Sequence, residues 1–233
     1  DFVPSRGLGD VYKRQGKGAM TSLLLEKCES LTAIEIDKDL IRFLKKAYGD
    51  RKNFNLIEKD ILLYDPKELV RVNKLIGNIP YNISTPIIEW IIDKKSSFDE
   101  IFLMLQKEFG ERCVAQPNTK SYGRLSIFVQ CFFDVTVIRE VDKSSFDPSP
   151  KVQSIFLKLI PKVSDMTPNS ILMKNLSTLT REAFSKRRKL ITNSLKSFFT
   201  EEDLVNLGIE RKSRPENLSV ETYIKLAKSI QSG

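Results

Sequence analysis

An asparagine, an isoleucine, a proline and a tyrosine follow one another at residues 78 to 81, directly after an aliphatic run that ends at Gly77. The side-chain oxygen of Asn78 and the main-chain carbonyl of Ile79 can both accept N–H bonds from an exocyclic amine, such as that of adenine. Two such bonds draw the amine nitrogen toward tetrahedral geometry and free its lone pair for attack. Pro80 would fix the orientation of that carbonyl, and the Tyr81 ring would stack on the base. These four residues are therefore predicted to activate an amine as a nucleophile.

The same segment also has a purely structural interpretation. A helix could begin here, with the proline near its first turn and with Asn82 or Ser84 as its cap. That interpretation explains the proline, but it leaves Asn78 and Tyr81 without a purpose.

Three further positions could hold a ligand. Gly16 and Gly18 precede a predicted helix and would let the backbone approach a ligand closely. Glu35 ends a predicted strand about 19 residues beyond this turn, where one carboxylate can accept both hydroxyls of a ribose. Asp60 follows the next predicted strand and could accept a hydrogen bond from the amino group of an adenine. Ordinary roles remain open for the acids of both turns, since Asp37 next to Glu35 suits a helix N-cap and Asp60 suits a turn.

The elements that must position these residues alternate between short aliphatic runs and amphipathic stretches. Six runs are predicted strands: 31–36, 53–58, 73–78, 100–105, 125–133 and 153–160. Helical stretches separate the first four, which predicts a parallel sheet with helices on both faces. The last two runs lack a long helix between them, which predicts an antiparallel pair at one edge. Ligands of open parallel sheets bind at the carboxyl ends of the strands, so Glu35, Asp60 and Asn78 should share one edge.

The pattern changes after Pro161, where strand signals cease and three or more helices are predicted. We therefore place a domain boundary near residue 161. Residues 162–233 contain 13 Lys and Arg against 8 Asp and Glu, which is +5 of the net charge of +8. Four consecutive basic residues concentrate this excess on a predicted helix: Lys186, Arg187, Arg188 and Lys189. The run is either a surface for a polyanion or a solvated helix face.

Composition excludes several classes of function. The chain of 233 residues has no histidine, which rules out Ser-His and Cys-His catalysis and His-ligated metals. Its three cysteines, Cys28, Cys113 and Cys131, are widely spaced and are predicted to be reduced core residues, with no metal site. No apolar run is long enough for a membrane span, and no signal peptide is recognisable, so we expect a soluble, cytoplasmic protein without a membrane partner.

The motifs together resemble one family, the KsgA-type ribosomal RNA adenine dimethyltransferases, in the wider group that includes the Erm methyltransferases. "NIPYNIST" is similar to the family's Asn-(Leu/Ile)-Pro-Tyr motif, and "MLQKE" and "YGRLS" resemble further signatures. "FDPSPKVQS" resembles Phe-x-Pro-x-Pro-Lys-Val-Asp-Ser, with Gln153 where the family often has Asp. "TREAFSKRRKLITNSL" resembles the basic helix of the family's C-terminal domain.

The resemblance implies a fold and a function. The fold would be α/β, a Rossmann-like class I methyltransferase with a mostly parallel sheet and an antiparallel edge strand, followed by a small all-α domain. The cofactor would be S-adenosylmethionine, bound by residues that include Gly16, Gly18, Glu35, Asp60, Ile61 and Asn78. The target site would be Asn78, Ile79, Pro80 and Tyr81, with Phe146 closing the other face of the base. Residues 186–189 would contact RNA.

The substrate implied by the resemblance is a hairpin near the 3′ end of small-subunit (16S) RNA in a pre-30S particle. Two adjacent adenines would each receive two methyl groups, and the enzyme would act as a monomer in ribosome assembly. Two alternatives stay open, an Erm-like enzyme of 23S RNA and a non-catalytic RNA-binding assembly factor.

The N-terminus departs from the family pattern. The family's first strand ends in a Glu-Ile-Gly-Pro-Gly-x-Gly turn, whereas Tyr12, Lys13, Arg14 and Gln15 stand before Gly16 here. Residues 1–15 show neither strand alternation nor helical period. We therefore interpret them as a non-native junction and expect the first domain, residues 16–161, to lack its first strand.

Overall fold

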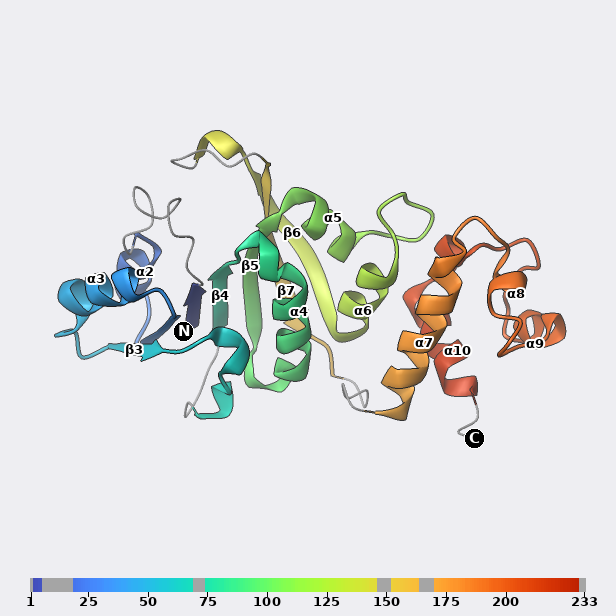
Figure 1. Cartoon of the computed structure of the whole chain (residues 1–233), viewed down its shortest axis with the longest axis horizontal. Coiled ribbons are helices and arrows are strands. Elements are labelled where there is room, and N and C mark those ends of the chain that lie inside the picture. The colour runs from blue at the N-terminus through green and yellow to red at the C-terminus, as the bar shows by residue number, and fades with distance from the viewer. Residues whose placement is uncertain (1, 6–18, 69–73, 146–151, 164–169, 231–233) are drawn as a thin grey trace. The chain divides into compact units, whose positions relative to one another are not determined.

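The computed structural model describes residues 2–5, 19–68, 74–145, 152–163 and 170–230 (Figure 1). The chain forms two compact units. Unit 1 comprises Asp1–Gly110 and Val135–Pro161, and unit 2 comprises Glu111–Asp134 and Lys162–Gly233. The units divide after Pro161, where the sequence pattern changes, but the chain also crosses between them after Gly110 and after Asp134. Residues 111–134 belong with the C-terminal helices rather than with the first domain.

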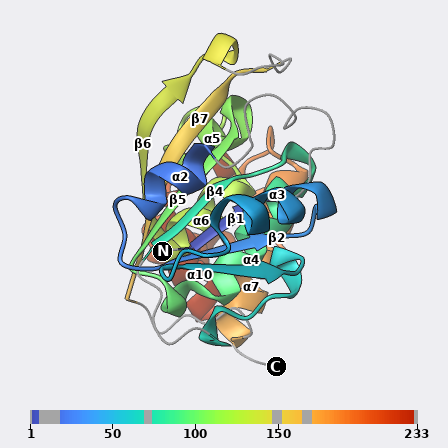
Figure 2. The same ribbon diagram turned by 90° about the vertical axis from the view of Figure 1, so that its left-hand side faces the viewer.

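A seven-stranded sheet forms the centre of unit 1, in the order β3-β2-β1-β4-β5-β7-β6 (Figures 1 and 2). The pairs from β3 to β5 are parallel, and β7 is antiparallel to β5. This confirms the predicted parallel sheet with an antiparallel edge. The strands are β1 (Phe2–Ser5), β2 (Leu31–Glu35), β3 (Phe54–Glu58), β4 (Lys74–Asn78), β5 (Glu100–Gln106), β6 (Phe133–Val141) and β7 (Ser154–Pro161).

Strand β1 corrects the expectation that the first strand is missing. Residues 2–5 lie between β2 and β4, in register with residues 32–35 of β2, and Phe2 lies opposite Leu75 of β4. The physical reason is that an empty central position would leave the backbone groups of both β2 and β4 unpaired. Four residues are enough to occupy that position, although they are too few to show a strand pattern in the sequence.

The helices of unit 1 connect these strands. They are α2 (Ala19–Leu25), α3 (Lys38–Tyr48) and α4 (Ser84–Asp93), and α5 (Lys107–Val114) runs across the boundary between the units. Helix α3 begins after Asp37, whose carboxylate accepts the N–H groups of Asp39 and Leu40 at 2.8 and 3.1 Å. Asp37 is therefore the helix cap that the sequence suggests, and α3 buries Ile41 and Leu44.

Unit 2 contains the helices α6 (Arg124–Phe132), α7 (Ile171–Ser185), α8 (Ile191–Ser194), α9 (Glu201–Asn206) and α10 (Val220–Ser229). Its core includes three aromatic rings, with the Phe184 ring centroid 6.4 Å from that of Tyr122 and 6.0 Å from that of Tyr223. Both buried tyrosine hydroxyls donate to carbonyls, of Leu218 and Pro215 respectively. These contacts bring residues near 122 to α7 and α10.

Helix α6 overturns the strand predicted at 125–133. A short, continuous apolar run does not distinguish a buried strand from a buried helix by its periodicity. The deciding contacts are local and polar: the hydroxyl of Ser126 accepts the N–H of Gly123 at 3.1 Å and donates to the carbonyl of Arg112 at 2.6 Å. The strand that pairs with β7 follows as β6.

Two features concern the cysteines and the absence of a membrane span that the composition predicts. Cys113 and Cys131 are buried free thiols, and Cys28 is half-buried. In the part of the chain that the structure describes, no helix has the length and apolar character needed to cross a membrane.

Candidate active site at the carboxyl ends of the parallel strands

Glu35 is the last residue of β2 and is held in an unusual way. Its side chain is 1% exposed. One carboxylate oxygen accepts the N–H groups of Ile36 and Asp37, both at 2.8 Å. The other oxygen, Oε2, is buried and has no hydrogen-bond partner among the described residues. A buried carboxylate oxygen without a donor is costly, so this atom is suited to accept a hydrogen bond from a ligand.

Burial also changes the acidity of this group. Removal from water raises the pKa of Glu35 from 4.5 to about 7, and the nearby charge of Asp37 acts in the same direction. The N–H groups of Asp37 and Ile36 stabilise the ionised form and oppose the shift. A perturbed carboxylate at the end of a parallel strand is typical of a functional site.

Asp60 lies two residues beyond the end of β3, which is in register with β2 so that Glu58 pairs with Glu35. Its carboxylate accepts the N–H of Leu62 at 3.0 Å and caps the short 3-10 helix η1 (Ile61–Leu63). The ordinary turn role is therefore present. Half-buried Asp60 and buried Ile61 nevertheless follow the strand next to Glu35, at the edge where open parallel sheets bind ligands.

Ile36 also lies at this edge of the sheet, although the strand pattern does not single it out. Its side chain is 42% exposed directly after buried Glu35. An exposed isoleucine directly after β2, the second strand from the sheet edge, presents an apolar side chain beside Glu35. In the sequence, only its position immediately after the acid in "LTAIEID" indicates that it lies at this edge.

Residues 78 to 81 lie at the same edge of the sheet, where β4 ends. Asn78 is half-buried opposite Met104 of β5, and the N–H of buried Ile79 donates to the carbonyl of Met104 at 3.0 Å. Pro80 precedes the 3-10 helix η3 (Tyr81–Ile83), and no side chain caps either η3 or α4. Ser84 instead donates to the carbonyl of Tyr81. Helical structure does begin after Pro80, as the structural interpretation expects, but the cap by Asn82 or Ser84 is wrong.

Tyr81 is anchored at its hydroxyl and exposed elsewhere. Its side chain is 37% exposed, and its hydroxyl lies 3.2 Å from that of Ser154, which is 1% exposed at the start of β7. Ser154 is the last residue of the "FDPSPKVQS" segment. This contact fixes the hydroxyl end of the Tyr81 ring, three residues after Asn78 in the sequence.

Three predicted site residues, Gly16, Gly18 and Phe146, lie outside the described residues. Glu35, Asp60, Ile61 and residues 78–81 all lie at the carboxyl ends of β2, β3 and β4, which run in the same direction. Within the described ranges, no group of His, Cys, Asp and Glu could hold a metal ion.

The basic run differs from its prediction in two ways. Helix α7 ends at Ser185, so residues 186–189 form a turn rather than a helix. Lys186, Arg188 and Lys189 are exposed, but Arg187 is half-buried and bonded within the protein.

The sheet order, with a central β1 next to β4 and an antiparallel β7, and the acid at the end of β2 define a Rossmann-like class I methyltransferase. The family model for ribosomal RNA adenine dimethylase matches residues 10–232. The chain belongs to the ribosomal RNA adenine dimethylase family.

Individual relatives agree with this assignment. The chain is 37% identical over 215 residues to ribosomal RNA small subunit methyltransferase A of Coxiella burnetii (strain CbuG_Q212), covering 91% of this chain and 83% of that protein. The corresponding protein of Legionella pneumophila (strain Corby) is 39% identical over 218 residues, with coverage of 93% and 84%.

Solved structures extend the comparison. A dimethyladenosine transferase from Plasmodium falciparum has a TM-score of 0.76 and 30% identity, covering 97% of this chain and 88% of that one. The 23S rRNA methyltransferase ErmE shares the fold, with a TM-score of 0.72, 21% identity and coverage of 98% and 90%.

Proposed function

We propose that the protein transfers methyl groups from S-adenosylmethionine to N6 of two adjacent adenines, in a hairpin near the 3′ end of small-subunit ribosomal RNA. It would act as a monomer on a pre-30S particle in the cytoplasm. The observation that carries the proposal is the shared edge of the sheet, with the unpartnered buried oxygen of Glu35 on one side of β1 and residues 78–81 on the other. Family membership and the names of the relatives support the choice of substrate.

The residues present fit the cofactor. Glu35 Oε2 lacks a donor, and the ribose of S-adenosylmethionine supplies two hydroxyl donors. Asp60 would accept from the adenine amino group, while Ile36 and Ile61 would contact the base, and Gly16 and Gly18 would approach the methionine part. When bound, the cofactor supplies an activated methyl group on a sulfonium.

The protein's contribution to the reaction would be to prepare the acceptor amine. Asn78 Oδ1 and the carbonyl of Ile79 would accept its two N–H bonds, which localises the lone pair on N6 and orients it. The Met104 carbonyl holds Ile79 by its N–H, so the position of the Ile79 carbonyl is tied to β5. The amine loses a proton to solvent after transfer, so the reaction needs no histidine base.

The hydroxyl of Tyr81 gives a prediction about ring positioning. Tyr81→Phe keeps the ring but removes the contact with Ser154, and we expect roughly a three- to tenfold loss of kcat/KM for RNA. Ser154→Ala should cause a similar loss, and the double variant should be no worse than either single one. Tyr81→Ala should lose about 1–3 kcal/mol more, because stacking is removed as well. Steady-state methylation kinetics measure all four; losses that multiply in the double variant would contradict the shared contact.

The pKa of Glu35 predicts how nucleoside binding depends on pH. Burial raises that pKa to about 7, and only the ionised carboxylate accepts two ribose hydroxyls freely. Below pH 7 the free protein takes up a proton that binding must expel. Affinity for adenosine should therefore fall by up to about tenfold for each pH unit below 7 and be constant above it. Calorimetric titration at pH 6 and pH 8 tests this, with 2′,3′-dideoxyadenosine as the control that should show no such dependence.

Methyl incorporation tests the function as a whole. Purified protein is incubated with radiolabelled S-adenosylmethionine and with undermethylated small or large ribosomal subunits. We expect label in adenines of the small-subunit RNA, ending as dimethyladenosine. Label in large-subunit RNA would favour the Erm-like alternative. RNA binding without label in either subunit would favour the non-catalytic assembly factor.

A further inference from the structure

Trp90, the single tryptophan of the chain, lies in α4 and is 7% exposed. Its indole N–H donates to the main-chain carbonyl of Tyr64 at 3.0 Å, in a buried bond between residues that are 26 positions apart. The bond joins α4 to the segment that follows β3. Because a buried carbonyl that loses its donor is costly, this bond helps to fix where residue 64 lies.

The segment held in this way begins with two residues proposed to bind the adenine of the cofactor, Asp60 and Ile61. The N–H of Tyr64 donates to the carbonyl of Ile61 at 3.1 Å and closes the turn η1. The carboxylate of Asp60 accepts the N–H of Leu62 at 3.0 Å in the same turn. These bonds make the turn one tight unit, so a shift of the Tyr64 carbonyl would also move Asp60.

A second contact from the end of α4 holds the far end of the same segment. Lys94 directly follows α4, and its Nζ lies 3.4 Å from Asp65 Oδ2. The helix itself is firmly packed, since Ile87 and Ile91 are both 0% exposed. Close-packed interiors transmit displacements, so residues 60–65 are tied to the position of α4 at two places.

We propose that Trp90 is a positioning residue for cofactor binding. It would not touch the cofactor, but through the carbonyl of Tyr64 it would hold Asp60 where the carboxylate can accept from the adenine amino group. The inference rests on the proposed function, which supplies S-adenosylmethionine as the ligand. Helix α4 also serves the acceptor site, because its first residue, Ser84, donates to the carbonyl of Tyr81 at 3.1 Å. One helix would then set the geometry of both sites.

The expected signature is a loss of selectivity for the amino group of adenine rather than a general loss of affinity. Adenosine carries this group and purine riboside lacks it, so the ratio of their affinities measures the bond to Asp60. Trp90→Phe keeps an aromatic ring but removes the indole N–H. We expect it to lower the affinity for adenosine about five- to tenfold and that for purine riboside by less than about twofold. Calorimetric titration with the two nucleosides measures both affinities.

Two variants accompany Trp90→Phe. Ile91→Val shortens a buried side chain of the same helix without removing the indole bond, so it should lower stability and leave the affinity ratio unchanged. Lys94→Met removes the contact with Asp65 from a half-buried side chain and should lower the ratio about twofold. Lys94→Met decides the matter if Trp90→Phe does not fold, and a wild-type ratio there would then overturn the proposal.

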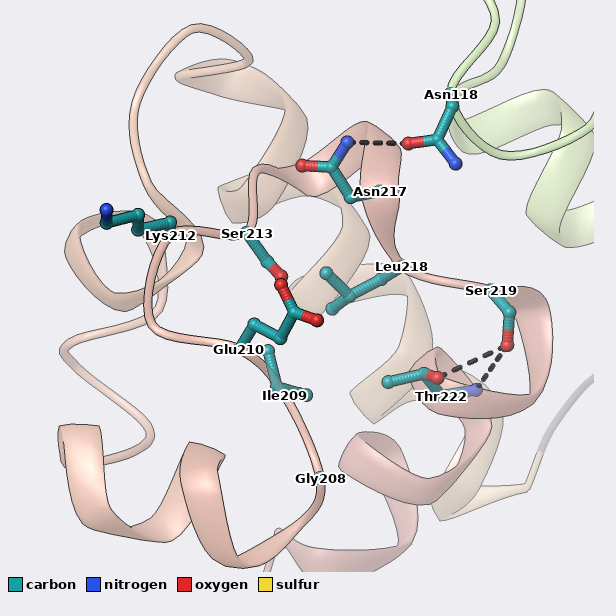
Figure 3. A pocket seen from close by; sticks show the side chains of 10 residues that line it. All are labelled: Asn118, Gly208, Ile209, Glu210, Lys212, Ser213, Asn217, Leu218, Ser219 and Thr222. Carbon is teal, nitrogen blue, oxygen red and sulfur yellow. Dashed lines mark hydrogen bonds between the residues drawn. The ribbon is translucent and has the colours of Figure 1, made fainter.

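A nucleoside could also enter a pocket of about 540 Å³ in unit 2, whose wall includes Asn118, Asn217, Thr222 and the carboxylate of Glu210 (Figure 3). Glu210→Gln controls for this pocket and should change neither affinity. Weaker adenosine binding in this variant would place the nucleoside in unit 2 and overturn the proposal.

The affinities of the wild-type protein separate this inference from the proposed function. A wild type that binds adenosine no better than purine riboside would refute both the role of Asp60 in the proposed function and the positioning role of Trp90. A wild type that prefers adenosine, together with an unchanged ratio in folded Trp90→Phe, would refute the positioning role alone. Equal losses for the two nucleosides in Trp90→Phe would do the same, because they would reduce Trp90 to a structural residue.

Discussion

Asn78→Ala will lower the rate of methyl transfer by about 10²–10³-fold while changing the affinity for S-adenosylmethionine by less than about threefold. The variant removes the one side-chain acceptor proposed for the target amine. The carbonyl of Ile79 remains in place, because its residue is held through a backbone bond to Met104. Alanine also preserves the pairing of residue 78 with β5. The loss should therefore appear in kcat rather than in cofactor binding.

The matched control is Asn82→Ala, an exposed asparagine four residues further along the same segment. It should retain nearly the full rate, because it caps no helix and lies beyond the motif. Single-turnover kinetics and calorimetric titration of the cofactor measure the two quantities separately. Equal losses of rate and of cofactor affinity in Asn78→Ala would contradict the assigned role.

Glu35→Gln will weaken S-adenosylmethionine binding by at least about 30-fold. The amide can still accept the N–H groups of Ile36 and Asp37, so the local backbone is preserved. In place of the unpartnered Oε2 it presents an NH₂ group, which cannot accept a ribose hydroxyl. The lost hydrogen bonds involve a charged acceptor and are worth about 1.5–3 kcal/mol each. Calorimetric titration measures the loss of affinity. The control is Glu58→Gln, because Glu58 pairs with Glu35 across β2 and β3 but is half-exposed.

The same variant will also change how stability depends on pH. Burial raises the pKa of Glu35 from 4.5 to about 7, so between these values the folded protein keeps a proton that the unfolded chain releases. The free energy of unfolding therefore falls as pH rises through this window, by about 3 kcal/mol in total. Glu35→Gln lacks this dependence. Denaturant unfolding at pH 5 and pH 8 should show the difference between the proteins; parallel pH profiles would mean that Glu35 is not buried as described.

Much of the site was predictable because its residues end strands. The acid in "LTAIEID" and the asparagine in "LIGNIPY" follow aliphatic runs, and parallel strands bring their carboxyl ends to one edge. The buried state of Glu35 could not be predicted, since it depends on the strands that flank β2. The anchor of Tyr81 at Ser154 was equally hidden, because the two residues are 73 positions apart.

The predictions that the structure overturns also depended on contacts between residues that are distant in the sequence. Residues 125–132 lie in helix α6, where Ser126 bonds with Gly123 and Arg112, and such contacts leave no trace in an apolar pattern. Residues 111–134 join unit 2 through long-range contacts, such as the bond from Tyr122 to the carbonyl of Leu218. Arg187 resembles its basic neighbours in the sequence, and only its partners distinguish it.

The shortness of β1 has a consequence for local opening of the sheet. Four residues connect the β2–β3 pair, which carries Glu35, to the strands that carry Asn78. Backbone amides along this seam should exchange with solvent deuterium sooner than those between β4 and β5. A molecule that contacts both Glu35 and Asn78 would bridge the seam and slow that exchange. Amide exchange along β1 would therefore report how much of the protein has this molecule bound.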